Sequence, residues 1–254
     1  MLINKSITIA VLLYMIQLGY PSDELASSID KISKYSLIDS LQDYKYTQPE
    51  RAISFATRVL KRKKYASGKY PKVESAFYNH LGEIYLRMNL PSQALSYYIE
   101  AKRLIPKSKA PWLEVQFGNV YYNQGEWIKA KNSYNKALEI FSNWKITGAR
   151  LDGKATGGNS VAGMTTCYSN LGRIEIQLKN YESALSYFEL ALETKQNRFD
   201  KGLDDHPMKF GGLSGVLYQE FLLADLYYKW GMIDLSMEKV SLIDSLGIPI
   251  YNKS

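Results

Sequence analysis

One set of spaced residues recurs along this 254-residue chain. In its clearest copy, the set is a large residue, a Leu-Gly pair and a tyrosine, followed by alanine, an aromatic residue, alanine and proline. These residues are Tyr78, Leu81, Gly82, Tyr85, Ala94, Tyr98, Ala101 and Pro106. The second half has the apolar spacing of an amphipathic helix. A set that returns in phase indicates a chain built from one repeated structural unit.

Two further copies keep most of these positions, and two more are degenerate. The next copy holds Glu114, Phe117, Gly118, Tyr121, Ala130, Tyr134 and Ala137. Another holds Tyr168, Leu171, Gly172, Ala184, Phe188 and Ala191, with Glu175 in place of the tyrosine. The degenerate copies are anchored by Ala52, Ala56 and Val59, and by Leu223, Ala224, Tyr227, Ser236, Val240 and Ile243.

The set resembles the tetratricopeptide (TPR) repeat, a pair of antiparallel helices joined by a short turn. The resemblance implies an all-α fold, a TPR-type α-solenoid of about ten helices in a right-handed superhelix. We expect about five repeats in residues 29–254, near 33–66, 75–108, 111–144, 165–198 and 217–250. Pro91 suits the first turn of a helix, and Gly125 and Gly231 suit helix ends.

The last two intervals between repeats are longer than the others. Successive repeat origins lie 42, 36, 54 and 52 residues apart, against about 34 for the repeat itself. The extra residues fall in two glycine-rich insertions, 143–164 and 197–215, which hold nine of the chain's 17 glycines. We expect loops that leave one edge of the solenoid, either as part of a binding site or as mobile linkers.

Residues 1–28 differ from the rest of the chain. Lys5 precedes an apolar run from Ile7 to Leu18, and the small residues Ala26, Ser27 and Ser28 follow. This resembles a secretory signal peptide and is short for a membrane span, which needs about 20 apolar residues. We therefore expect a periplasmic or secreted protein that meets the membrane only transiently. The alternatives are an uncleaved anchor or a terminal helix packed on the solenoid.

The net charge of +7 is concentrated between residues 58 and 72. The cluster consists of Arg58, Lys61, Arg62, Lys63, Lys64, Lys69 and Lys72. Such a cluster can attract an acidic partner, anionic lipid or nucleic acid. Aromatic residues for base stacking are not interleaved with these charges, so we favour a solvated loop and expect no nucleic-acid partner.

Motifs that would indicate catalysis or a bound cofactor are incomplete. Residues 148–154, GARLDGK, nearly match a phosphate-binding loop, but Ala155 stands where Ser or Thr must hold Mg²⁺. His80 and His206 lack zinc-ligand spacing, and Cys167 is suited to be a buried thiol. We predict no catalytic, cofactor-binding or metal-binding residues, and a non-enzyme.

In TPR proteins that bind peptides, two positions of each first helix face the concave groove. The resemblance places Asn79 and Glu83, Val115 and Asn119, Ser169 and Arg173, and Phe221 and Asp225 at these positions. Tyr122 and Tyr228 lie one turn further on. The lysine that clamps a peptide carboxylate in chaperone-binding members is absent from this set. The predicted groove residues are Asn79, Glu83, Asn119, Tyr122, Arg173, Asp225 and Tyr228. The alternative is that these side chains merely face solvent.

Three functions follow from these observations. The leading one is an exported scaffold that binds a protein or peptide in its groove. A second resemblance, to the periplasmic sensor halves of bacterial signalling proteins, implies a ligand-sensing input module, although this chain carries no output domain. A remote alternative is a nucleotide-binding or hydrolytic enzyme that uses the glycine-rich segments. The sequence does not predict an oligomeric state.

Overall fold

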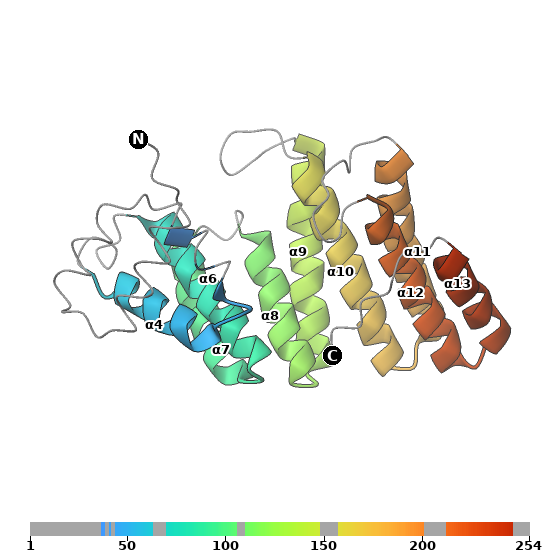
Figure 1. Ribbon diagram of the computed structural model, residues 1–254. Helices are drawn as coiled ribbons and strands as arrows, with labels where there is room; N and C mark the ends of the chain where they lie inside the picture. The colour runs from blue at the N-terminus through green and yellow to red at the C-terminus, as the bar shows by residue number, and fades with distance from the viewer. Residues whose placement is uncertain are drawn as a thin grey trace. The chain divides into compact units, whose positions relative to one another are not determined.

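Helices are the only regular secondary structure in the residues that the structure describes. The structure is a computed structural model that describes residues 37–38, 41, 44–62, 70–105, 110–147, 157–200 and 212–245 (Figure 1). Within these ranges there are nine helices and no strand. The prediction of an all-α, TPR-type solenoid is confirmed as the fold class. No helix in the described ranges has the length and apolar character needed to cross a membrane.

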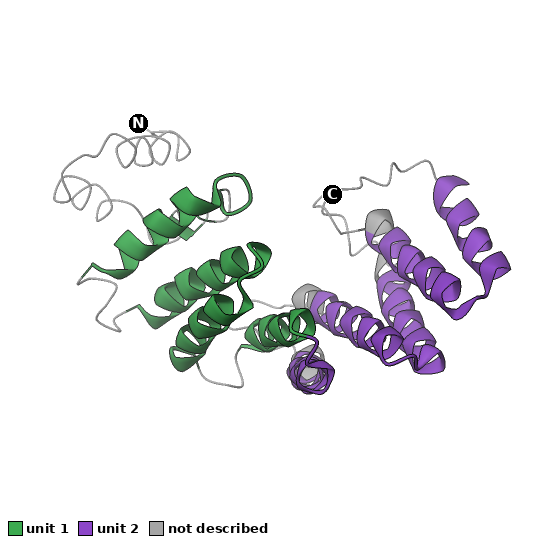
Figure 2. Ribbon diagram, turned by 90° about the horizontal axis from the view of Figure 1, so that it is seen from below, with its two compact units in different colours: residues 1–124 green, residues 125–254 purple. Residues whose placement is uncertain are grey.

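The helices fall into two compact units, divided between Gln124 and Gly125 (Figure 2). The first unit contains α4 (Pro49–Leu60), α6 (Pro71–Arg87), α7 (Pro91–Arg103) and α8 (Pro111–Asn123). The second contains α9 (Trp127–Thr147), α10 (Gly157–Gln177), α11 (Tyr181–Asp200), α12 (Gly212–Trp230) and α13 (Ile233–Ser245). In each unit a helix packs on the next one along the chain, and α6 also touches α8 as α10 touches α12. This is the packing order of stacked helical hairpins.

Proline begins four helices, and all four prolines occupy the first helical position. They are Pro49, Pro71, Pro91 and Pro111. Proline is tolerated there because the first backbone N–H groups of a helix have no partner within it. The prediction for Pro91 is therefore confirmed.

The four turns inside the repeats share one backbone conformation. Asn89, Gly125, Lys179 and Gly231 all have positive φ, between 59° and 85°. They are spaced by 36, 54 and 52 residues, the same intervals as the predicted repeat origins. In three of the turns the following N–H donates back to the helix: Leu90 to the Tyr85 carbonyl (2.9 Å), Asn180 to Glu175 (2.8 Å) and Met232 to Tyr227 (2.9 Å). These bonds close the helix ends as Schellman motifs.

The repeats are held together by large side chains packed on small ones. Tyr98, Tyr134 and Phe188 hold equivalent positions and are fully buried. A Cβ atom added to Gly172 would lie 2.6 Å from Phe188 Cε1, and one added to Gly82 would lie 2.4 Å from Tyr98 Cε1. Only glycine leaves room for these rings. The glycine of the signature therefore sets how closely the two helices of a repeat approach.

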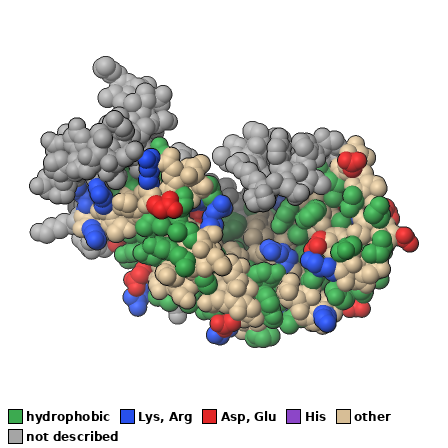
Figure 3. Space-filling model, turned by 60° about the horizontal axis from the view of Figure 1, so that its bottom comes forward, with side chains coloured by type: hydrophobic (Ala, Val, Ile, Leu, Met, Phe, Trp, Pro, Cys, Tyr) green, Lys and Arg blue, Asp and Glu red, His purple; other side chains and the backbone are tan. Residues whose placement is uncertain are grey.

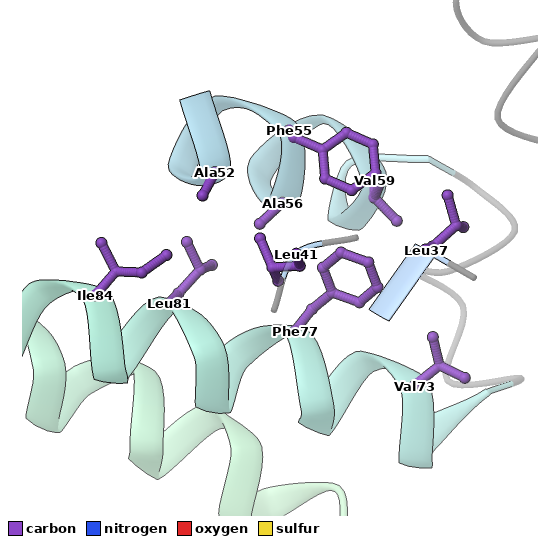
Figure 4. Close-up of a cluster of buried hydrophobic side chains, with 10 residues drawn as sticks. All are labelled: Leu37, Leu41, Ala52, Phe55, Ala56, Val59, Val73, Phe77, Leu81 and Ile84. Carbon is purple, nitrogen blue, oxygen red and sulfur yellow. The ribbon is translucent and has the colours of Figure 1, made fainter. Parts of the chain in front are cut away.

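The core of the first unit extends beyond its predicted signature residues. Leu37 and Leu41 are buried together with Phe55 of α4 and Phe77 of α6. Figure 4 shows Leu41 between α4 and α6. The described residues of the degenerate first copy therefore pack directly on the clear copy, because apolar burial requires only apolar residues of suitable size.

The two insertions were expected to be loops, and their described parts are helical instead. α9 continues to Thr147 and α10 begins at Gly157, while α11 continues to Asp200 and α12 begins at Gly212. These helices have 21, 21, 20 and 19 residues, against 13 for α7 and for α8. Residues 148–156 and 201–211 lie outside the described ranges.

One glycine of the first insertion has a packing role. A Cβ atom on Gly163 of α10 would lie 2.3 Å from Phe141 Cζ of α9. Glycine normally weakens a helix interior by up to about 1 kcal/mol. Here the helix persists because packing against Phe141 requires the small residue. The glycine content suggested a loop because composition carries no information about this packing.

Substitution of Gly172 by alanine tests this packing. We expect Gly172→Ala to lower the free energy of unfolding by about 2 kcal/mol, because overpacking outweighs the better helix propensity of alanine. Chemical denaturation provides the measurement. Ser183→Ala, at an exposed position of α11, is the control and should change stability little. Equal stability of Gly172→Ala and the wild type would contradict the close approach.

Lys179 offers a second test, with the opposite sign. A lysine with φ of 61° bears a steric cost of about 1–2 kcal/mol, part of which glycine recovers. We expect Lys179→Gly to raise the free energy of unfolding by about 0.5–1 kcal/mol, after the larger entropy of an unfolded glycine is counted. Gly231→Ala, at the equivalent turn, should lower it by a similar amount. Two changes of the same sign would show that the turns are not equivalent.

Candidate functional site

The predicted groove residues lie on the first helices of the repeats and are divided between the two units. Asn79 and Glu83 lie on α6, and Asn119 and Tyr122 lie on α8, all in the first unit. Arg173 lies on α10, and Asp225 and Tyr228 lie on α12, in the second unit. The two groups have different surroundings.

In the first unit, three predicted residues are joined by one hydrogen-bonded network. The Asn79 side-chain amide donates to Glu83 Oε1 at 3.0 Å. Gln116 of α8 donates to the same oxygen at 3.1 Å, and Asn119 donates to Gln116 Oε1 at 3.1 Å. The network therefore ties the neighbouring first helices α6 and α8 to each other.

Two buried basic side chains complete the network at the other oxygen of Glu83. Lys45 forms a hydrogen-bonded ion pair with Glu83 Oε2, and His80 Nδ1 lies 3.3 Å from that oxygen. Lys45 and His80 are both buried. Local sequence carried no signal for Lys45, because it lies 38 residues before its partner in a degenerate repeat.

Glu83 is held ionised by these neighbours. Burial by itself would raise the pKa of the carboxyl group, but the hydrogen bond and charge of His80, and then the charge and hydrogen bond of Lys45, outweigh it and lower the pKa from 4.5 to about 2. A carboxylate with a depressed pKa stabilises the fold above the unfolded pKa. Its contribution is lost as the pH falls from about 4.5 towards 2.

This network predicts a pH-dependent effect of Glu83→Gln. The amide leaves Lys45 buried without a counter-charge, so we expect a loss of about 3 kcal/mol at pH 7. The difference between variant and wild type should shrink as the pH falls from 4.5 to 2, because protonation removes the same charge. Denaturation at a series of pH values measures it. The control is Glu100→Gln, which removes an exposed ion pair with Arg103 and should lower the free energy of unfolding by less than about 1 kcal/mol. A difference between Glu83→Gln and the wild type that stays constant with pH would contradict the account.

In the second unit, a buried acid replaces the signature tyrosine. Glu175 of α10 is buried and pairs with Lys131 of α9. Asn180 donates to its other oxygen at 2.9 Å. The hydrogen bond from Lys131 to Glu175 raises the pKa of Lys131. The departure from the signature is therefore compensated by an ion pair between consecutive helices.

One position expected to face a ligand is used for packing between first helices. Ser169 of α10 is buried and donates to Gln219 Oε1 of α12 at 2.8 Å. Ser169 holds the position in its repeat that Asn79 holds in its own. Asn79 in the first unit and Ser169 in the second therefore both make hydrogen bonds within the protein. Val115, at the same position of α8, is buried as well.

The exposed face of α12 has a different character. Tyr218, Phe221 and Tyr228 are exposed on it, Tyr228 by 67%. Asp225 lies among them and accepts a hydrogen bond from Lys229 at 2.7 Å. Arg173, at the equivalent position of α10 to Asp225, is also exposed. Figure 3 shows hydrophobic side chains among polar ones at the right of the view, on the side where Figure 1 labels α11 to α13. Tyr218 was not predicted, although its helical spacing from Phe221 and Tyr228 is readable in the sequence.

Cys167 is confirmed as a free buried thiol, whose burial raises its pKa to about 12. Within the described ranges, no group of His, Cys, Asp and Glu is placed to hold a metal ion. Arg58 and Lys61 of the basic cluster are exposed at the end of α4. Lys63, Lys64, Lys69, His206, residues 1–28 and the loop-like motif 148–154 lie outside the described ranges.

Comparisons with known proteins agree with this architecture. Two models of the tetratricopeptide repeat match the chain, over residues 75–108 and 165–207. The first range is the one predicted for the clearest repeat. No curated protein sequence matches the chain significantly. The two matched ranges are therefore similar to tetratricopeptide repeats, and the helical hairpins of the described residues agree with that similarity.

Solved structures similar to this chain share its fold at low sequence identity. BtubC (BKLC) from P. vanneervenii is 17% identical, with 99% of this chain and 96% of that chain covered and a TM-score of 0.61. PilF of Pseudomonas aeruginosa is 16% identical, with 85% and 77% covered and a TM-score of 0.56. The apo form of RapI is 15% identical, with 96% and 97% covered and a TM-score of 0.55. At these identities the similarities show a shared fold.

Proposed function

We propose that this chain is an exported, non-catalytic scaffold that binds a peptide or a partner protein through the first helices of its second unit. The exposed aromatic face of α12, formed by Tyr218, Phe221 and Tyr228, carries the proposal. Folds of this class are typically scaffolds rather than enzymes. The proposal assigns no cofactor and no reaction.

Aromatic side chains suit such a role for a physical reason. Tyrosine and phenylalanine bury a large apolar area while immobilising only two side-chain torsions, so they are frequent anchors in interfaces. Single exposed apolar residues are common, whereas several on one helix face are a candidate contact surface. Asp225 lies among these aromatic residues, Lys229 is on the same helix and Arg173 is on α10. Their charges favour a ligand that carries both apolar and polar side chains.

The first unit is less suited to primary contacts. Asn79, Glu83 and Asn119 already share hydrogen bonds with Gln116, Lys45 and His80. A ligand would have to replace these bonds, and leaving a buried polar group without a partner costs about 1–3 kcal/mol. Tyr122 is half-buried on α8. We therefore assign these four residues a supporting role and place the ligand on Arg173, Asp225 and Tyr228, with Tyr218 and Phe221 added.

Peptide selection against the purified chain tests this assignment. We expect selected peptides rich in apolar residues, and at least about tenfold weaker binding to Tyr228→Ala and to Phe221→Ala, as is typical of interface anchors. Tyr46→Ala, at a tyrosine of the first unit that is 57% exposed, is the matched control and should bind normally. Selected peptides that bind both α12 variants as well as the wild type would place the binding site elsewhere.

Export is tested separately. A fusion of residues 1–30 to a reporter that is active only outside the cytoplasm should give activity, because a charged start, an apolar run and small residues form an export signal. A matched fusion with Leu12→Arg and Leu13→Arg should give none. Equal activity of the two fusions, or none from the first, would contradict export and leave the peptide-binding proposal intact.

A further inference from the structure

The last described helix, α13, leaves an apolar stripe uncovered. Ile233, Met237 and Val240 follow one another at helical spacing and are all exposed, Met237 by 60% and Val240 by 46%. Ser236 and Ile243, on the neighbouring face, are buried against the rest of the unit. The stripe therefore borders the core but is not part of it.

The equivalent stripe of the preceding second helix is covered. Counting back one repeat of 52 residues, the stripe corresponds to Tyr181, Leu185, Phe188 and Leu192 of α11. These four side chains pack in one cluster with Leu222, Leu223 and Leu226 of α12. Val240 thus holds the position at which Phe188 is fully buried, where Phe188 contacts both Gly172 of its own repeat and the leucines of α12. The surface of α13 continues, in register, the interface that joins one repeat to the next.

The fourth position of the stripe carries a charge. In α7 this position is Lys102, whose Nζ lies 2.7 Å from Glu114 of α8 and 4.6 Å from the centroid of the Phe117 ring. The pair joins the end of α7 to the start of the helix that covers it. In α13 the position is Asp244, which is exposed. A helix that covers α13 in the same way would meet an acid where α8 meets a base.

We propose that Ile233, Met237, Val240 and Asp244 form a docking surface for an amphipathic helix of a partner protein. The partner helix runs antiparallel to α13, places an apolar stripe on Met237 and Val240, and carries a lysine or arginine in its first turns opposite Asp244. This surface lies on a second helix, so it is distinct from the peptide-binding face of α12. Two kinds of evidence support it: continuity with the packing between repeats, and the charge left for the incoming helix to match.

The helix that covers α7 provides a probe for this surface. The probe is a fluorescein-labelled, helix-stapled peptide with the sequence of residues 111–123 and the substitution Glu114→Lys. A second peptide, its match, has the same label and staple but retains Glu114. Fluorescence anisotropy with the full chain measures binding. We expect the lysine peptide to bind about fivefold more tightly than its match, since one interfacial ion pair replaces a repulsion. Asp244→Lys in the chain should reverse the preference.

Variants of the stripe locate the binding. Met237→Glu with Val240→Glu should remove binding of both peptides, whereas Ile128→Glu, at an apolar residue of α9 that is 66% exposed, should leave it unchanged. Tyr228→Ala should leave it unchanged too, which separates this proposal from the peptide-binding one. Circular dichroism checks that each variant is folded.

Four results would overturn the proposal. They are equal affinity of the two peptides for the wild type, binding of neither peptide, binding only after residues 246–254 are removed, and a wild-type dimer that the stripe variant dissociates in sedimentation. The third result would assign the surface to this chain's own following segment, and the fourth to a second copy.

Discussion

The close contact between a glycine on one helix and an aromatic ring on the next is the constraint on which the remaining packing depends. Gly82 receives Tyr98, and Gly172 receives Phe188. The ring can be buried only because the glycine has no side chain, and this sets both the separation and the register of the two helices. With that register set, the turn residues, the apolar cores and the faces left to solvent follow for each repeat.

Residues on the first helices of different repeats serve two different purposes. Around Glu83, buried charges and amides stabilise the contact between α6 and α8, since an unpaired lysine or carboxylate there would be costly. On α12, aromatic side chains face solvent and make no comparable contribution to the core. A shared position in the repeat therefore does not imply a shared role, and the surroundings of each side chain decide between structure and binding.

The sequence predicted the fold well and the candidate site only in part. The spacing of Gly82, Tyr98, Gly172 and Phe188 was sufficient for the helical hairpins, because each contact lies within one repeat. The partnership of Lys45 with Glu83, and of Lys131 with Glu175, joins separate repeats, and no local pattern encodes it. The extended helices α9 to α12 were missed because the glycines suggested loops, whereas packing of Phe141 on Gly163 requires a glycine inside a helix.

A double-mutant cycle between Gly172 and Phe188 tests the central constraint most directly. The free energy of unfolding is measured for the wild type, Gly172→Ala, Phe188→Leu and the double variant. The smaller leucine makes room for the added methyl group. The account therefore predicts that the double variant loses less free energy of unfolding than the sum of the two single losses, by about 1 kcal/mol or more. Additive losses, within about 0.3–0.5 kcal/mol, would contradict the claim that this contact sets the packing of the repeat.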